Sequence, residues 1–139
     1  MNWKRFSTAA IAVFVSVQAL EFLFNGVLLK SAYEPLKGLW RPNMSSRAWL
    51  MYVLSALVAV LFVYIFVKGR ENKGLAEGVR FGLLMWLFIV VPMNVGWWVM
   101  LPIGWQIILR WILVGLLEML VAGILVAAIY KPAAPAKAA

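Results

Sequence analysis

The sequence predicts an all-α fold, a four-helix transmembrane bundle with short connections. Four long apolar runs fill most of the chain, and each can cross a hydrocarbon core of about 30 Å, which takes roughly 20 helical residues. The composition agrees, with 65% hydrophobic residues, 13% charged residues and a mean hydropathy of +0.94. A soluble core of this size could not cover so much apolar surface. Because backbone groups in lipid must bond within their own segment, each run is expected to be a helix.

The elements follow in order from the apolar runs and the polar segments between them. The predicted helices cover residues 6–29, 48–67, 78–101 and 107–130. The first connection contains Pro35, Gly38 and Pro42, and is expected to be a short irregular or interfacial segment. The other two connections are short turns. Residues 1–132 are therefore predicted to form one domain, and residues 133–139, which lack an apolar period, are predicted to be disordered.

The first run has some features of a secretory signal. Lys4 and Arg5 precede it, and residues 16–19 offer a small-residue pattern that a signal peptidase could accept. Hydrophobicity nevertheless continues to Leu29, which a cleaved signal would not need. We therefore expect a retained first helix.

Basic residues predict the orientation, because Lys and Arg favour cytoplasmic loops. Four spans put both termini on one side. That side carries Lys4, Arg5, Lys68, Arg70, Lys73, Arg80, Lys131 and Lys137. The opposite side carries fewer: Lys30, Lys37, Arg41, Arg47 and Arg110. Both termini are accordingly predicted to be cytoplasmic.

The residue types that are missing narrow the chemistry. The chain has no Cys, no His and no Asp, which removes disulfides, the usual Cys and His metal ligands, and the Ser–His and Cys–His pairs of common hydrolases. We therefore expect no enzymatic activity, no metal and no cofactor. The net charge of +8 comes mostly from the ends of the apolar runs, where Lys and Arg meet lipid headgroups. The expected partner is the lipid bilayer and not nucleic acid.

Two acids inside the apolar runs are the main indication of function. Glu21 and Glu118 lie at a depth of about 10–12 Å from the outer ends of their helices, and Asn94 lies at a similar depth. Gln18 and Asn25 share a helical face with Glu21. No Lys or Arg is expected at this depth, and a charged acid at mid-membrane costs at least ~2.5 kcal/mol. At least one of the two acids is therefore expected to be protonated near neutral pH.

Two interpretations of these acids remain open. They could join helices through hydrogen bonds, or they could line a cavity and bind a proton or cation in alternation with a small solute. Pro92, beside Asn94, could kink the third helix there. We favour proton- or cation-linked transport of a small solute. The alternative is a non-catalytic accessory subunit or assembly factor of a larger membrane complex.

Aromatic residues gather near the predicted outer ends of the helices. Together with Arg110, the candidates for an outer vestibule are Trp97, Trp98, Trp105 and Trp111. An interfacial aromatic belt is the favoured interpretation of such residues. A vestibule would instead stack its rings against an organic cation.

Small residues and charges near the third helix predict local packing. Gly74, Gly78 and Gly82 recur at every fourth residue, and Gly123 and Ala127 repeat the spacing in the fourth helix. This spacing allows close helix contact. We expect that contact within one chain, with a homodimer seam as the alternative. Glu77 and Arg80 are expected to form an ion pair.

Several short segments resemble a group of small bacterial four-helix integral membrane proteins with no established activity. The segments are Lys4-Arg5-Phe6, Leu39-Trp40-Arg41-Pro42, Glu77-Gly78-Val79-Arg80-Phe81-Gly82 and Ile129-Tyr130-Lys131-Pro132. The resemblance covers nearly the whole chain and implies a multi-pass protein of the bacterial inner (cytoplasmic) membrane. The chain also resembles, more loosely and only in size and helix arrangement, the small multidrug-resistance exporters. These exporters use a glutamate in their first helix, and Glu21 would match that acid. The chain departs from them in Glu118, in its long basic loop and in lacking their helix-three Trp-Gly pattern.

Overall fold

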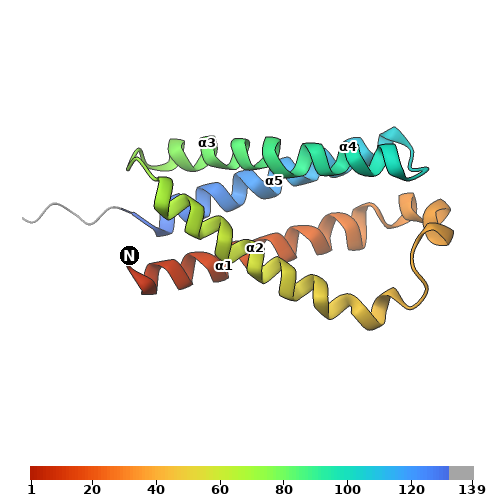
Figure 1. Ribbon diagram of the computed structural model, residues 1–139, viewed down its shortest axis with the longest axis horizontal. Helices are drawn as coiled ribbons and strands as arrows, with labels where there is room; N and C mark the ends of the chain where they lie inside the picture. The colour runs from red at the N-terminus through yellow and green to blue at the C-terminus, as the bar shows by residue number, and fades with distance from the viewer. Residues whose placement is uncertain (132–139) are drawn as a thin grey trace, which may run out of the picture.

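The computed structural model describes residues 1–131, and all regular structure in that range is helical (Figure 1). The elements are α1 (Trp3–Glu21), η1 (Phe22–Leu28), η2 (Lys30–Leu39), η3 (Met44–Arg47), α2 (Ala48–Gly69), α3 (Leu75–Met85), η4 (Trp86–Val90), α4 (Val91–Met100) and α5 (Trp105–Ile129). Of the η elements, η1 and η4 are π-helical, while η2 and η3 are 3₁₀-helical. The predicted disordered tail, residues 133–139, lies outside the described residues.

These elements join into four helical rods that are long and apolar enough to cross a membrane. The rods are Trp3–Leu28, Met44–Gly69, Leu75–Met100 and Trp105–Ile129, and an 18-residue stretch of each has a mean hydropathy of 1.8, 2.7, 1.8 and 2.7 in turn. The predicted four long helices are confirmed, and the chain has the character of a multi-pass membrane protein. The first connection differs from the irregular segment predicted for it, because η2 and η3 give most of it short-range helical bonds.

Both described ends of the chain meet at one end of the bundle, here called the terminal end. The backbone N–H of Asn2 donates to the Tyr130 hydroxyl (2.9 Å), and the Arg5 guanidinium donates to the Lys131 carbonyl (2.6 Å). Arg70, in the turn between α2 and α3, donates to the Tyr130 carbonyl (2.9 Å). The opposite end, which holds η2, η3 and the turn before α5, is called the loop end.

The terminal half of the bundle is closed by the main hydrophobic core. Its buried members come from α1, α2 and α5: Phe6, Ala9, Ala10, Val13, Ala59, Phe62, Val63, Phe66, Ala122, Val126, Ala127 and Tyr130. Phe81 of α3 completes the closure, because its ring contacts Phe62 (centroids 4.7 Å apart) and Phe66 (5.3 Å) edge-on. Apolar packing thus holds α2 against α3 in this half.

The α3–α5 seam is where the backbones approach most closely. A Cβ added to Gly78 would lie 2.7 Å from the Cβ of Ala127, and one added to Gly82 would lie 2.9 Å from the Met119 carbonyl carbon. The predicted glycine contact is therefore confirmed within one chain for Gly78, Gly82 and Gly123. Gly74 precedes α3 and serves the turn instead, with a φ of 71°.

The predicted ion pair between Glu77 and Arg80 is wrong. Arg80 binds Glu71 instead, at 2.7 Å. Glu77 is buried, and its carboxylate accepts the backbone N–H groups of Glu71 and Lys73. Both N–H groups belong to the turn before α3, and a carboxylate in the first turn of a helix is also favoured by the helix dipole. Glu77 therefore fixes the turn into α3.

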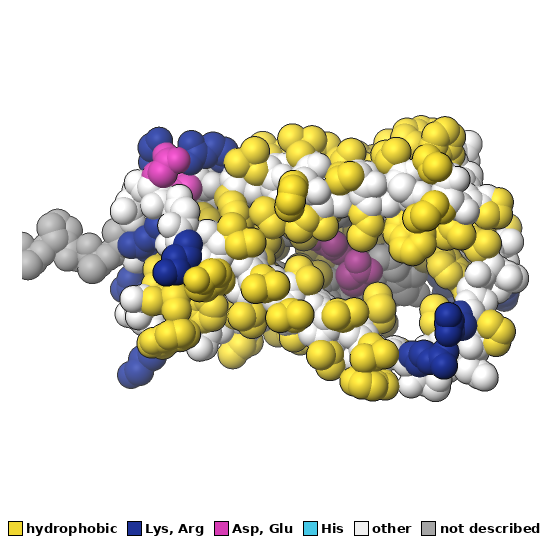
Figure 2. Space-filling model, in the orientation of Figure 1, with side chains coloured by type: hydrophobic (Ala, Val, Ile, Leu, Met, Phe, Trp, Pro, Cys, Tyr) yellow, Lys and Arg dark blue, Asp and Glu magenta, His cyan; other side chains and the backbone are white. Residues whose placement is uncertain are grey.

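The loop half of the bundle is open between α2 and α4. Helix α2 packs on α1 and makes no comparable contact with α4. The first half of α2 has no core residue, and its apolar side chains Leu50, Met51, Leu54 and Leu57 are all exposed. Figure 2 shows a hollow between these two rods, with acidic side chains at its floor.

Candidate functional site

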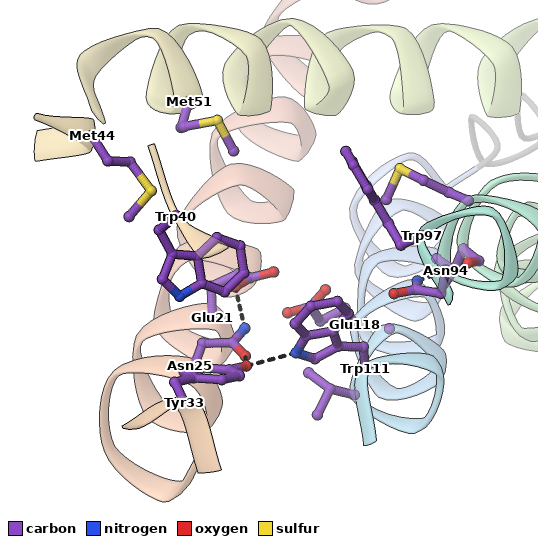
Figure 3. Close-up of a pocket in the computed structure, with 14 residues that line it drawn as sticks. Glu21, Asn25, Tyr33, Trp40, Met44, Met51, Asn94, Trp97, Trp111 and Glu118 are labelled. Carbon is purple, nitrogen blue, oxygen red and sulfur yellow. Dashed lines mark hydrogen bonds between the residues drawn. The ribbon is translucent and has the colours of Figure 1, made fainter. Parts of the chain in front are cut away.

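The hollow leads to a cavity of about 530 Å³ between α1, α2, α4 and α5. Its lining combines acids, amides, aromatic rings and methionines, drawn from every rod of the bundle. The side chains with polar or aromatic groups are Glu21, Asn25, Tyr33, Trp40, Asn94, Trp97, Trp111 and Glu118 (Figure 3). Met44, Met51 and Met93 contribute thioethers. A volume of 300–1,000 Å³ is typical of small-molecule sites.

Glu118 is the most unusual group in this cavity. It is only 6% exposed, and its Oε1 has no hydrogen-bond partner among the residues that the structure describes. Trp111, Gly115 and Glu118 share one face of α5 because they are four and three residues apart. A Cβ at Gly115 would clash with Val90, so this glycine lets η4 approach α5 beside the acid. A buried polar atom without a partner is costly and needs an explanation.

Glu21 stands at the end of a chain of hydrogen bonds. The Trp111 indole N–H donates to the Tyr33 hydroxyl (2.7 Å), which donates to the Asn25 carbonyl oxygen. The Asn25 amide N–H then donates to the Glu21 carboxylate. Every bond in this chain points its donor toward Glu21, so the carboxylate is the final acceptor (Figure 3).

Tyr33 keeps its proton in this arrangement. Burial raises the pKa of its hydroxyl above the ordinary value of 10.0, the Trp111 hydrogen bond opposes that rise, and the nearby Glu21 carboxylate adds to it. The hydroxyl therefore remains a donor to Asn25 at neutral pH.

Neither cavity acid has a basic partner. Among residues 1–131 the ion pairs join Lys37 to Glu34, and both Lys73 and Arg80 to Glu71. All of them lie outside the cavity lining. Figure 3 shows Glu21 from α1 and Glu118 from α5 in the lining of the same cavity. Negative charge here has no compensating cation within the described chain.

Glu21 was predicted to be buried, but its side chain is exposed at the cavity wall. The reason is the separation of α2 from α4, which leaves the α1 face uncovered at this depth. Glu21 also borders a neighbouring recess of about 390 Å³ between α1 and α2.

Both π-helical segments lie beside the acids. Segment η1 directly follows Glu21 and contains Asn25, and η4 ends at Val90 on the cavity wall. The sequence explains segment η4, because Pro92 has no N–H group to donate to the carbonyl of Phe88, four residues earlier. A wider turn just before the proline accommodates the missing bond. Single π turns are frequent at functional sites.

The remaining predicted residues divide between the cavity and its surroundings. Asn94 lines the cavity but donates to the Val90 carbonyl (2.8 Å) and not to either acid. Gln18 lies in the neighbouring recess and donates to Ser55 (2.6 Å). Of the vestibule candidates, Trp97 and Trp111 line the cavity. Trp98 and Trp105 pack edge-on against each other instead (5.4 Å), and the lining does not include Arg110.

Sequence reasoning missed Tyr33, Trp40 and the three methionines. Only the first connection offered a signal, since it concentrates aromatic residues between two helices whose ends must be close. The methionines carry no pattern distinct from ordinary lipid-facing residues. Comparisons with family models, curated proteins and solved structures each gave no match to the chain. The argument for function therefore depends on the geometry of this cavity.

Proposed function

We propose that this protein is a bacterial inner-membrane transporter that couples the movement of a small solute to a proton or cation through Glu21 and Glu118. The observation that supports this proposal is the buried Glu118 oxygen without a partner, opposite a second acid in an open cavity. Acids inside a membrane are costly, and they commonly mark ion pathways. Helix-joining hydrogen bonds would instead give both carboxylate oxygens of Glu118 a protein partner.

The two acids divide the work in this proposal. One acid is ionised while the other holds the exchangeable proton, and the Asn25 amide N–H donates to the Glu21 carboxylate. Among the cavity-lining residues the titratable groups are Glu21, Glu118 and Tyr33. Because Tyr33 keeps its proton, exchange falls to the two acids.

The packing of the bundle supports alternating access. Phe81 closes the terminal half against Phe62 and Phe66, while the loop half stands open. Separating these rings and bringing α2 onto α4 would expose the acids to the other side. Small shifts of packed helices are a common way to switch access.

Proteoliposomes with an enclosed pH-sensitive dye test this function. A panel with one organic ammonium, one neutral sugar, one amino acid and one carboxylate is added outside, and internal pH is recorded. At least one class should move protons with the wild-type protein, and Glu21→Gln and Glu118→Gln should each abolish that movement. Glu34→Gln, which neutralises an exposed acid outside the cavity, is the matched control. Folded wild-type protein that moves protons with no class would contradict the proton-coupled form of the proposal.

The orientation belongs to the same proposal, with both termini in the cytoplasm. Because the chain has no Cys, a single engineered thiol reports its own side. Ser45→Cys at the loop end should react with a membrane-impermeant maleimide in intact cells, and Asn72→Cys should react only after permeabilisation. The reverse result would invert the orientation.

The alternative function, an accessory subunit of a larger complex, is favoured by one observation. Helix α2 has an almost fully exposed first half, which a partner helix could cover. Stoichiometric partners would then co-purify in mild detergent, and Glu21→Gln with Glu118→Gln would leave that assembly intact.

A further inference from the structure

We infer that the cavity takes an amphiphilic organic monocation, an ammonium-type charge on an apolar body, from the lipid through the opening between α2 and α4. This inference rests on the proposed function and names the ligand of the same site.

The charge of the ligand follows from the acids. The cavity presents Glu21 and Glu118 without a basic group in its lining, and the protein donor that reaches Glu21 is the neutral Asn25 amide. Glu118 is only 6% exposed, and its Oε1 has no hydrogen-bond partner among the described residues. This oxygen can therefore accept a hydrogen bond from an N–H group of a ligand, or contact its cationic centre. An anionic ligand would be repelled by the negative charge of these acids. A single positive charge matches one ionised acid, while the other acid carries the exchangeable proton.

The apolar body of the ligand follows from the remaining walls. Trp40, Trp97 and Trp111 come from three different segments and surround the acids (Figure 3). Indole faces attract organic cations and also pack against hydrocarbon. The thioethers of Met44, Met51 and Met93 adapt to ligands of irregular shape. The lining has few hydrogen-bond donors that could recognise a sugar or a peptide.

The entry route follows from where the bundle is tied and where it is open. At the loop end, the Trp111–Tyr33 hydrogen bond and the packing of the two rings (6.2 Å) join η2 to α5 across the axial path. Between α2 and α4 there is no comparable link. The rim of that opening is apolar, with Met51 at 69% and Met93 at 54% exposure. Figure 2 shows the acids through this side opening. A ligand dissolved in the lipid can therefore reach them directly.

Binding to protein in nanodiscs tests the ligand class with two probes of nearly equal shape and opposite charge, tetraphenylphosphonium and tetraphenylborate. The phosphonium should bind saturably and the borate should not. Glu118→Gln and Glu21→Gln should each weaken phosphonium binding by about tenfold or more, because each removes a carboxyl group that can pair with the cation, while Glu34→Gln should leave it unchanged. Glu21 is exposed, so Glu21→Gln remains informative if Glu118→Gln folds poorly. Tetramethylammonium, which has the charge without the apolar body, should not compete.

The route is tested by closing the opening. In a Met51→Cys/Met93→Cys variant, a bis-maleimide should bridge α2 to α4 and slow phosphonium entry more than a monofunctional maleimide does on the same variant.

The outcomes separate this inference from the proposed function. Equal binding of both probes, or phosphonium binding unchanged in both glutamine variants, overturns the monocation. Proton movement driven by another class in the panel would then leave the transport function standing. Unchanged entry after bridging overturns the lipid route.

Discussion

At the scale of single residues, the two acids differ because their neighbours differ. Glu21 has a ready donor in Asn25, one helical turn away on the same face. Glu118 has small neighbours that make room without supplying a donor, and its Oε1 stays without a partner. Tyr33 connects the two walls, since its hydroxyl accepts from Trp111 and donates to Asn25.

Replacing Tyr33 by Phe removes the hydroxyl and leaves the Trp111 N–H and the Asn25 carbonyl oxygen without their partner. We expect a loss of about 1–3 kcal/mol in the free energy of unfolding, the cost of an unsatisfied buried group. Denaturant titration in detergent micelles measures it. Tyr52→Phe, at an exposed tyrosine, is the control. Equal stability of the two variants would show that the hydrogen-bond chain contributes nothing.

Glu71 gives a prediction for pH dependence. Hydrogen bonds from Lys73 and then Arg80 lower the pKa of its carboxyl below the ordinary value of 4.5. A lowered pKa in the folded state contributes stability that is fully present above 4.5 and lost as pH falls through the folded value. The wild type should therefore unfold at a slightly higher temperature than Glu71→Gln at pH 7, with the gap vanishing in acid. Because these pairs are exposed, high salt should also reduce the gap. A gap that is constant with pH would contradict the ion pairs.

At the scale of elements, the packing between the rods positions the candidate site. The α3–α5 seam is a rigid contact at glycines, and it holds Glu118 and the η4 turn in fixed relation. The π segments η1 and η4 widen the helices beside the acids. Helix α2 is attached mainly through α1 and the terminal core, and its first half contributes no residue to that core.

Gly78→Ala tests the seam. The added Cβ would lie 2.7 Å from the Ala127 Cβ, so α3 and α5 must separate. Overpacking of this kind typically costs about 1–3 kcal/mol. Gly96→Ala in α4 is the matched control, since a Cβ there meets nothing within 4 Å and the helix should gain about 0.5–1 kcal/mol. Thermal unfolding of both variants in micelles decides it, and a stable Gly78→Ala protein would mean that the seam is loose.

At the scale of the whole molecule, the bundle is closed at the terminal half and open at the loop half. The difference arises because large aromatic residues gather in the first region, whereas the α2–α4 interface of the second has no buried core. Access to the acids is therefore a property of the assembled rods and not of any one rod.

The difference between the two halves can be measured with single engineered cysteines, because the natural chain has no Cys. Val114→Cys, on the cavity wall, should react readily with a lipid-soluble maleimide in nanodiscs, and Val126→Cys, fully buried in the closed half, should not. A water-soluble sulfonated maleimide should reach Val114→Cys more slowly. Equal reaction at positions 114 and 126 would show that the two halves are alike.

Much of the fold was predictable because lipid leaves the backbone few choices. The four long helices follow from apolar length alone, and Gly78, Gly82 and Gly123 indicated the seam by their spacing. The candidate site was predictable as far as Glu21, Asn25, Asn94 and Glu118 reaching one cavity. The pairing of Glu77 was not predictable, because a turn brought backbone N–H groups nearer than Arg80. Tyr33 and Trp40 were missed because their position depends on how η2 folds back.

By itself, the sequence determined the four long apolar rods and the positions of the two acids along them, since both follow from spacing along a helix. Only the tertiary structure decided which half of the bundle closes, that Glu118 keeps an oxygen without a partner, and that Glu21 is exposed at a cavity. Those features depend on contacts between rods far apart in the chain. Helix spacing fixes the height of a side chain in the membrane, whereas packing between helices decides what that side chain meets.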